Sequence, residues 1–265
     1  MKRLVLLIPS LLTACAVSPA YAGGIGCALT GTGLVAMGAI LCLVFALIGH
    51  GPIRASWPDR WAMLIFIGLT VGLIATLPKV CTAAVPDQAN KYRRDLVRLA
   101  HAEWGLDAPV ATFAAQIHQE SGWNEKARSR VGAEGLSQFM PGTAAWIARL
   151  RKELAANEPM NPVWAMRSMI VYDDWLHHRV QARRPCDKWA MTLSAYNGGL
   201  GWVIRDKRLA SAKGADPLAW FNSVERHNSG RSTANFKENR DYPRKILLRW
   251  EPLYERAGWG TGVCS

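Results

Sequence analysis

The residues best placed to do chemistry in this chain surround Glu120. It ends an apolar, helix-like run, Val110–Gln119, and is followed at once by Ser121–Asn124, with the sequence SGWN. Two further motifs follow, Gly135–Pro141 with the sequence GLSQFMP and Ala195–Gly199 with the sequence AYNGG. A carboxyl group at a helix end, among apolar and aromatic residues, is what a general acid with a raised pKa requires. The pattern therefore predicts an enzyme.

A second carboxyl group is not evident near Glu120. Cleavage of a glycosidic bond ordinarily takes two, one as acid and one as base or nucleophile. Glu125 lies in a polar stretch and Glu134 in a glycine-rich turn. One carboxyl group is enough when the substrate supplies its own nucleophile, because Glu120 can protonate the leaving oxygen and then accept a proton from an attacking substrate hydroxyl. This reasoning favours an intramolecular transglycosylation, which needs no water.

Four motifs in order, Glu120–Gly122, Gly135–Pro141, Ala195–Gly199 and Tyr242, resemble those of bacterial peptidoglycan lytic transglycosylases with a goose-type-lysozyme-like catalytic domain, as in the soluble lytic transglycosylases. The resemblance covers about residues 88–257. It implies a mainly α, lysozyme-like helical domain with a groove for peptidoglycan glycan strands and no cofactor. It also implies cleavage between N-acetylmuramic acid and N-acetylglucosamine, leaving a 1,6-anhydromuramic product.

The same resemblance implies roles for individual residues. Glu120 matches the sole catalytic acid/base, and Tyr242 matches the tyrosine placed near it. Ser121 matches a hydroxyl that helps to fix the adjacent chain. The matched substrate-binding positions are Gln138, Met140, Tyr196 and Asn197.

Two residues depart from the family pattern, and one more is a binding candidate. Ser137 stands where many members have Met, which alters the wall of the groove. Pro243 replaces the usual branched residue but suits a helix start. Trp123 is a candidate platform for stacking against a sugar ring.

The elements that must position these residues are expected to be helices almost throughout residues 88–257. The first expected helix ends near Gly105, and the second spans about 109–120. The third runs through 144–156 after a Thr143 cap, and the fourth starts at Asn161-Pro162 and reaches about 182. The fifth spans 186–196, and the last starts at Asp241-Tyr242-Pro243. Alternating β-branched residues are scarce, so any strand is expected to be small. Residues 214–235 are richest in loop formers.

The N-terminus has the pattern of an export signal, residues 1–22. Lys2-Arg3 is followed by an apolar core and by the cleavage pattern Ala20-Tyr21-Ala22. An alternative is a lipoprotein box, Leu12–Cys15, in which Cys15 would carry the lipid. Cleavage after Ala22 is favoured because membrane spans follow and make a lipid anchor redundant. Either way the mature N-terminus lies outside the cytoplasm.

Residues 23–85 are expected to form a transmembrane hairpin. Residues 25–48 contain no charge and residues 61–85 contain only Lys79, and each stretch reaches the roughly 20 residues needed to cross a bilayer. The loop 50–60 carries Arg54 and Arg60 and is therefore expected in the cytoplasm. Residues 86–265 then form a periplasmic catalytic domain tethered to the inner membrane. A buried soluble hairpin is disfavoured because neither stretch has a polar face.

Six cysteines fit an exported protein. Cys27 and Cys81 come to similar depths in the hairpin, so a bridge between them is geometrically allowed. Cys186 and Cys264 are the only two in residues 86–265, and an oxidising compartment favours their pairing. The sequence does not show whether their Cα atoms approach closely enough. No metal-ligand spacing is present.

The charge balance and the domain order leave several partners to weigh. Residues 86–265 carry 27 Lys and Arg against 19 Asp and Glu, but without a long basic run, so nucleic acid is disfavoured as a partner.

One rival to the lytic transglycosylase is a hydrolytic muramidase of the same fold. Another is a non-catalytic membrane component of a type IV secretion-like assembly, since the hairpin resembles secretion pilins. A wall-opening enzyme serving a secretion or conjugation complex, or phage lysis, is equally compatible with the domain order.

Overall fold

The computed structural model describes residues 84–264 of the 265-residue chain. The predicted signal peptide, nearly all of the predicted hairpin, and Cys15, Cys27 and Cys81 lie outside the described residues. Within residues 84–264, none of the helices combines the length and apolar character needed to cross a membrane.

The described part is mainly helical, as expected. Its helices are α3 (Asp87–Asn90), α4 (Arg93–Trp104), α5 (Val110–Ser121), α6 (Pro141–Ile147), α7 (Pro162–His177), α8 (Pro185–Gly198), α9 (Leu200–Ala212), α10 (Thr233–Lys245) and α11 (Glu251–Arg256). Short 3₁₀ turns span Lys152–Leu154 and Val224–Arg226, and a π-helical turn spans Ile246–Trp250. The β structure of residues 84–264 is limited to two isolated bridges, Arg128 with Glu134 and Glu134 with Phe139.

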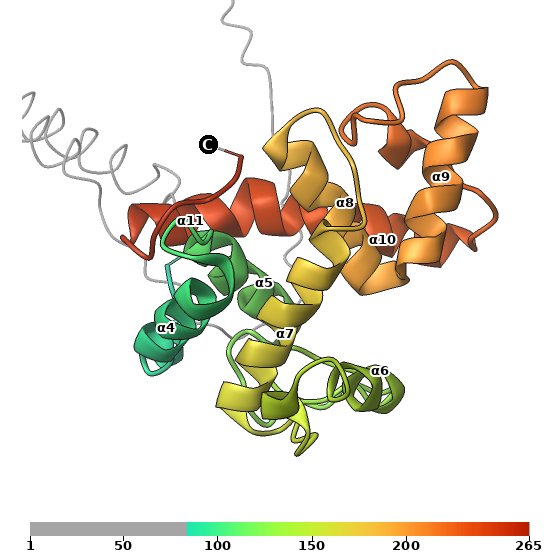
Figure 1. The fold of residues 1–265 in the computed structure, drawn as a ribbon. Coiled ribbons are helices and arrows are strands. Elements are labelled where there is room, and N and C mark those ends of the chain that lie inside the picture. Colours follow the sequence, from blue (N-terminus) through green and yellow to red (C-terminus); the bar gives the residue numbers. More distant parts are fainter. Residues whose placement is uncertain (1–83, 265) are drawn as a thin grey trace, which may run out of the picture.

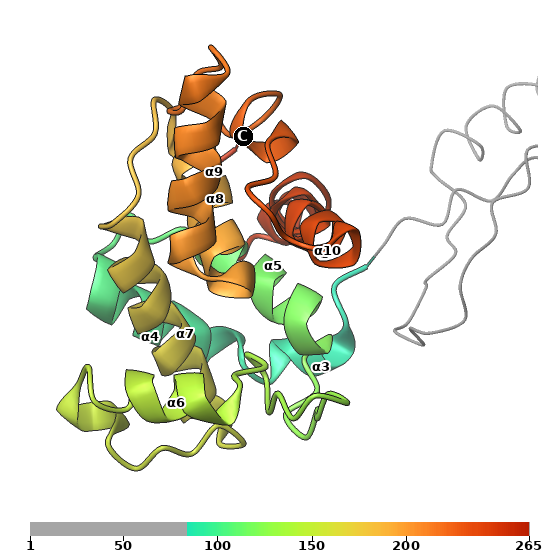
Figure 2. The ribbon, with the colours of Figure 1, turned by 90° about the vertical axis from the view of Figure 1, so that its right-hand side faces the viewer.

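Helix α5 forms the centre of the fold. Its residues from Val110 to Ile117 are all buried, and three of these eight are alanines, which let neighbouring helices approach closely. Helices α4 and α11 and the π turn pack against it. In Figure 1 α5 lies between α4 and α11, and Figure 2 shows α5 from the side. A helix buried on all sides holds its last residues in a fixed place, and Glu120 is one of them.

A second group of helices lies beside this centre. Helix α8 packs against α7, α9 and α10, so it connects α7 with the C-terminal helices α9 and α10 (Figure 1). The end of α8 carries the AYNGG motif, and α10 carries Tyr242. The packing of α10 on α8 and of the π turn on α5 brings three of the four motifs to one region.

Several helix boundaries follow the expected signals. Asn161 caps α7, where its side chain accepts hydrogen bonds from the backbone N–H groups of Val163 and Trp164. Gly105 follows α4 with φ of 79°, and Gly122 ends α5 in the left-handed conformation with φ of 57°. The turn at Gly122 ends the helix just beyond Glu120.

Two expected helices are shorter than the sequence suggested. Helix α6 starts at Pro141, so Thr143 lies inside it rather than capping it, and the helix ends at Ile147 instead of continuing to 156. Pro141 fits the first helical turn because its missing N–H has no partner there in any case. Helix α7 ends at His177 rather than near 182. The residues after it form a connection to Arg184, which is extended because it precedes Pro185.

The C-terminal part differs most from expectation. Helix α9 was not predicted, and α10 starts at Thr233, capped by the Ser232 side chain, eight residues before the expected start at Asp241. Pro243 therefore lies inside a helix, where it lacks a hydrogen-bond donor. A π turn, Ile246–Trp250, follows α10 directly. Ile246 and Tyr254 nevertheless face the core as expected.

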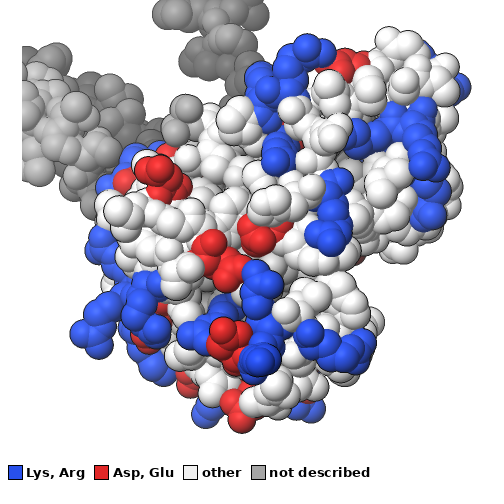
Figure 3. All heavy atoms as spheres, in the orientation of Figure 1, with Lys and Arg blue, Asp and Glu red and all other residues white. Residues whose placement is uncertain are grey.

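The chain end is fastened to this core. Cys186 and Cys264 form a disulfide with their Cα atoms 4.8 Å apart. The buried carboxylate of Glu251 accepts hydrogen bonds from the backbone N–H groups of Val263 and Cys264 and from the Thr112 hydroxyl. The tail thus packs against the first turn of α5. On the face shown in Figure 3, basic side chains are spread over several elements with acidic ones between them.

Candidate active site

Glu120 lies at the C-terminal end of α5, partly buried. The Tyr242 hydroxyl donates a hydrogen bond to Glu120 Oε1. Desolvation by burial raises the pKa of Glu120 to about 8; the hydrogen bond from Tyr242 opposes this rise and the nearby charge of Glu238 adds to it. At pH 7 the carboxyl group is therefore mostly protonated, by a factor of roughly ten.

A cavity of about 520 Å³ opens beside Glu120, between the ends of α5 and α8 and one face of α10. Its polar lining suits a hydrophilic ligand such as a glycan. The lining residues are Gln119, Glu120, Asn197, Ala234, Lys237, Glu238, Asp241, Tyr242 and Lys245.

Three of the residues named from the sequence line this cavity: Glu120, Tyr242 and Asn197. Tyr196 lies beside it rather than in its lining. Its ring is parallel to that of Tyr242 with centroids 6.5 Å apart, and its hydroxyl donates to the Ser137 carbonyl at 2.8 Å. Tyr196 thus ties the GLSQFMP segment to α8 behind Tyr242.

The other residues predicted to bind substrate, Gln138, Met140 and Ser121, do not line this cavity. Gln138 donates to the carbonyls of Ala127 at 3.2 Å and Gly135 at 2.9 Å, so its amide holds its own loop together. Met140 is 42% exposed and does not line the cavity. The Ser121 hydroxyl donates to the Ile117 carbonyl of its own helix at 3.4 Å.

Trp123 is not a sugar-stacking platform. It is 1% exposed, and its indole N–H donates to the Tyr254 hydroxyl at 2.5 Å. The expectation was wrong because the left-handed turn at Gly122 directs the next residue into the core. Ser137 is also fully buried and donates to the Ala165 carbonyl at 2.9 Å, so it does not form part of a groove wall.

Four charged residues of α10 that line the cavity were missed from the sequence: Lys237, Glu238, Asp241 and Lys245. Glu238 precedes Tyr242 by four residues, so the two share a helix face. That spacing would have been a usable signal, but the helix was expected to start only at Asp241. Lys237 and Asp241 form an ion pair at 3.1 Å.

The two carboxyl groups weighed from the sequence are engaged elsewhere. Glu125 pairs with Lys91 at 3.0 Å, and Glu134 pairs with Arg128 at 2.9 Å. A third carboxyl group, Asp173 of α7, was not anticipated. It is fully buried and bonded to Gln116 at 3.4 Å, and burial, followed by the charge of Glu120, raises its pKa. Since it has no exposed surface, Asp173 cannot touch a substrate.

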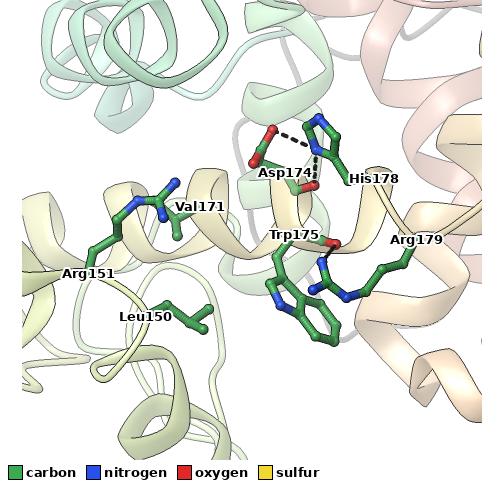
Figure 4. Close-up of a pocket in the computed structure, with 7 residues that line it drawn as sticks. All are labelled: Leu150, Arg151, Val171, Asp174, Trp175, His178 and Arg179. Carbon is green, nitrogen blue, oxygen red and sulfur yellow. Dashed lines mark hydrogen bonds and ion pairs between the residues drawn. The ribbon is translucent and has the colours of Figure 1, made fainter.

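A second, smaller cavity of about 110 Å³ lies beside α7 (Figure 4). Its polar groups already bind one another or neighbouring residues. His178 contacts Asp174 at 3.2 Å, and Arg179 donates to the Trp175 carbonyl at 2.8 Å. Arg151 pairs with Glu103 at 2.7 Å. None of the residues named from the sequence lines this cavity.

The fold and the larger cavity together define a helical domain with a carboxyl group of raised pKa at the wall of a polar cavity, which is what a general acid for a glycosidic bond requires. Residues 98–218 match the family model described as the transglycosylase SLT domain. The match includes Glu120 and the motifs 135–141 and 195–199, whereas Tyr242 and α10 lie beyond it. The resemblance stated from the motifs is confirmed.

Curated relatives of the chain are named as lytic murein transglycosylases. The chain is 31% identical over 119 residues to membrane-bound lytic murein transglycosylase F of Vibrio parahaemolyticus, covering 43% of this chain and 21% of that protein. It is 28% identical over 187 residues to the protein of the same name from Thiobacillus denitrificans, covering 64% and 37%. The chain thus spans only 21% and 37% of the length of these two relatives. The lytic transglycosylase Slt of Pseudomonas aeruginosa superposes with a TM-score of 0.48 at 24% identity, covering 66% of this chain and 25% of that structure.

Proposed function

We propose that this protein cleaves the bond between N-acetylmuramic acid and N-acetylglucosamine in peptidoglycan by intramolecular transglycosylation. The observation that carries the proposal is the position of the Glu120 carboxyl group, which accepts a hydrogen bond from Tyr242 at the wall of an open polar cavity and whose pKa is raised by burial. The SLT domain match supports this substrate and this class of reaction.

The reaction balances with one carboxyl group. Glu120 gives its proton to the glycosidic oxygen as the bond from that oxygen to the anomeric carbon of N-acetylmuramic acid breaks. The 6-hydroxyl of the same sugar then attacks the anomeric carbon, and its proton passes to the Glu120 carboxylate. The products are a free 4-hydroxyl on N-acetylglucosamine and a 1,6-anhydro ring, and Glu120 is again protonated.

Tyr242 supports both halves of this cycle. Its hydroxyl donates to Oε1 of Glu120, which leaves Oε2 to carry the transferred proton. The same hydrogen bond stabilises the carboxylate between the two steps and keeps the pKa of Glu120 from rising further. Burial and the nearby charge of Glu120 hold the pKa of Tyr242 above its usual range, so its hydroxyl stays a donor.

Hydrolysis by the same domain is the second candidate, because Glu238 also lines the cavity. A carboxylate there could activate a water molecule on the sugar while Glu120 acts as the acid, as in enzymes that use two carboxyl groups. In that case the product would carry a reducing end in place of the anhydro ring.

Mass analysis of sacculus digests separates the two reactions. The anhydro product is lighter than the hydrolytic product by one water molecule. The full-length wild-type chain is expected to give anhydromuropeptides, and Glu120→Gln is expected to give none while keeping the wild-type melting temperature. Glu125→Gln is the matched control, since it makes the same change outside the cavity and should leave the products unaltered. Digests with only reducing ends would refute transglycosylation.

For cellular placement, we propose an inner-membrane tether formed by residues 23–85, with residues 86–265 in the periplasm. The basis is the uncharged stretches and the basic loop of the sequence. The name of the relatives, membrane-bound lytic murein transglycosylase F, is compatible with such a tether. We further propose that the enzyme opens the wall for a secretion or conjugation machine. A purely scaffolding role predicts that Glu120→Gln leaves that process intact.

A further inference from the structure

Asn239, on α10, is a buried amide whose side chain makes several hydrogen bonds. It is 2% exposed. Its side chain contacts the Ser194 hydroxyl at 2.8 Å, the Ser194 carbonyl at 2.8 Å, Arg240 at 2.6 Å and Asn197 at 3.0 Å. All four possible hydrogen bonds of its carboxamide are therefore made inside the protein.

The orientation of this carboxamide follows from the chemistry of its partners. A guanidinium group only donates, so the atom that faces Arg240 Nη1 must be the amide oxygen. A backbone carbonyl only accepts, so the atom that faces the Ser194 carbonyl must be the amide nitrogen. The two constraints agree, and the amide of Asn239 has one permitted orientation.

That orientation determines what Asn197 presents to the cavity. The second N–H of the Asn239 amide points to Asn197 and can only donate, so the Asn197 atom that receives it must be Oδ1. The NH₂ group of Asn197 is then the end left free. Since Asn197 is exposed and lines the cavity beside Glu120, its free NH₂ group offers a hydrogen-bond donor to the cavity.

The arrangement is anchored deep in the domain. Arg240 pairs with fully buried Asp206 at 2.6 Å and donates to the carbonyls of Glu225 at 2.9 Å and His227 at 2.8 Å. A guanidinium group with these partners cannot rotate away from Asn239 without leaving a buried charge unpaired. The orientation of an exposed cavity residue is thus determined by a buried ion pair on the far side of α10.

We propose that Asn239 is a positioning residue that turns the NH₂ group of Asn197 toward an oxygen acceptor of the glycan. The acceptor class is an N-acetyl carbonyl or a sugar hydroxyl. This inference rests on the proposed function, because it assigns a role in binding the same glycan. Asn239 itself touches no substrate and acts only through Asn197.

The test measures binding without turnover. Full-length chain carrying Glu120→Gln is titrated with a peptide-free tetrasaccharide of alternating N-acetylglucosamine and N-acetylmuramic acid. Asn239→Asp keeps the size of the side chain but removes both N–H donors, so Asn197 must reverse its amide and present an oxygen. The expected result is a dissociation constant raised about tenfold, the effect of one lost hydrogen bond with an opposed acceptor.

Asn197→Asp tests the same point without disturbing a buried group. It keeps an acceptor for Asn239 but replaces the cavity-facing donor with an oxygen, so it should weaken binding to a similar extent. In the Asn197→Ala background, Asn239→Asp should cause no further loss of affinity. In chain with Glu120 intact, Asn239→Asp should leave the alkaline limb of the kcat/KM profile in place, which a general distortion around Glu120 would shift.

Ser194→Ala is the matched control. It removes one hydrogen bond to the same amide but leaves Arg240 and the Ser194 carbonyl to fix the orientation. It should lower the melting temperature while changing affinity by less than twofold. The proposal is overturned if Asn239→Asp weakens binding no more than Ser194→Ala, if Asn197→Asp binds as tightly as its parent, or if the loss persists in the Asn197→Ala background. Absence of tetrasaccharide binding by the parent would overturn it too, whereas digests lacking anhydro products would contradict the proposed reaction alone.

Discussion

Glu120 must give up a proton in one half of the proposed reaction and recover it in the other, and its surroundings balance these demands. Burial favours the neutral acid and raises the pKa, while the hydrogen bond from Tyr242 favours the carboxylate and lowers it. The outcome is a pKa of about 8, near the pH at which such a group works best as both acid and base.

The first prediction concerns this balance. Only protonated Glu120 can start the reaction, so kcat/KM of the wild-type chain should fall as the pH rises through about 8. Tyr242→Phe removes the contact that lowers the pKa, so the alkaline limb should move to higher pH. At pH 7 the variant should also lose about tenfold in kcat/KM, because a hydrogen bond to a charged group contributes about 1.5 kcal/mol or more. The measurement is a pH–rate profile on purified sacculi.

Tyr196→Phe provides the comparison for that profile. Tyr196 lies beside Tyr242 but donates to the Ser137 carbonyl and not to Glu120. Its replacement should leave the alkaline limb where it is and lower the free energy of unfolding by about 1 kcal/mol. A limb that stays fixed in Tyr242→Phe, or moves to lower pH, would show that Tyr242 does not control Glu120.

At the residue scale, short motifs were informative where a residue carries chemistry by its own type. Glu120, Tyr242 and Asn197 were named from the sequence and line one cavity. Asn239 and Asp173 could not be found in this way, because their importance depends on burial and on partners far along the chain. A buried amide and a surface amide look the same in a sequence.

At the scale of elements, α8 and α10 approach each other at Gly198, and this contact gives the second prediction. A Cβ atom at Gly198 would lie 2.6 Å from Asn239 Nδ2. Asn239 cannot yield cheaply, since its amide is held on all sides. Gly198→Ala should therefore reduce the free energy of unfolding by about 1–3 kcal/mol, measured by urea unfolding.

Gly142→Ala is the matched change within α6. A Cβ atom there meets nothing within 4 Å, and the residue is exposed and helical. Alanine restricts the unfolded chain more than glycine does, so this variant should be unchanged or more stable by about 0.5–1 kcal/mol. Equal losses in both variants would mean that helix propensity, and not the α8–α10 contact, explains the effect.

Helix prediction failed where local signals conflicted with packing. Pro243 indicated a helix start because proline is favoured in the first turn. Instead α10 had already begun at Thr233, so Pro243 lies inside the helix. Helix α9 follows Gly198-Gly199 almost without a break. The two glycines correctly indicated the end of one helix, but they gave no sign that another helix begins directly after them.

At the scale of the whole domain, the disulfide between Cys186 and Cys264 fastens the tail to α8 across 78 residues of chain, and this gives the third prediction. Cys186→Ser with Cys264→Ser should lower the free energy of unfolding by about 2–4 kcal/mol, mainly because the unfolded chain is less restricted. Urea unfolding with and without dithiothreitol checks this, and the reductant should destabilise the wild-type chain more than the double variant.

Activity should survive that change at 25 °C. The tail contacts α5 near Thr112, which lies about 12 Å along the helix from Glu120 at 1.5 Å per residue. Loss of activity at a temperature where the variant remains folded would mean that the tail controls the site and not only the stability of the domain.

The fourth prediction concerns the orientation of the whole chain in the membrane. The proposed reaction requires the cavity to face peptidoglycan, so residues after Pro86 must lie in the periplasm, while Arg54 and Arg60 are expected to keep the loop 50–60 in the cytoplasm. Alkaline phosphatase becomes active only where its disulfides can form. Fused after Pro86 it should therefore be active, and fused within the loop 50–60 it should be inactive.

Replacing Arg54 and Arg60 with Gln should weaken this contrast, because the basic side chains are the orienting signal. Asp59→Asn should not weaken it, because acidic residues contribute little to orientation. Activity from the loop fusion and none from the fusion after Pro86 would place the cavity on the side of the membrane without a substrate, and the proposed function could not stand with it.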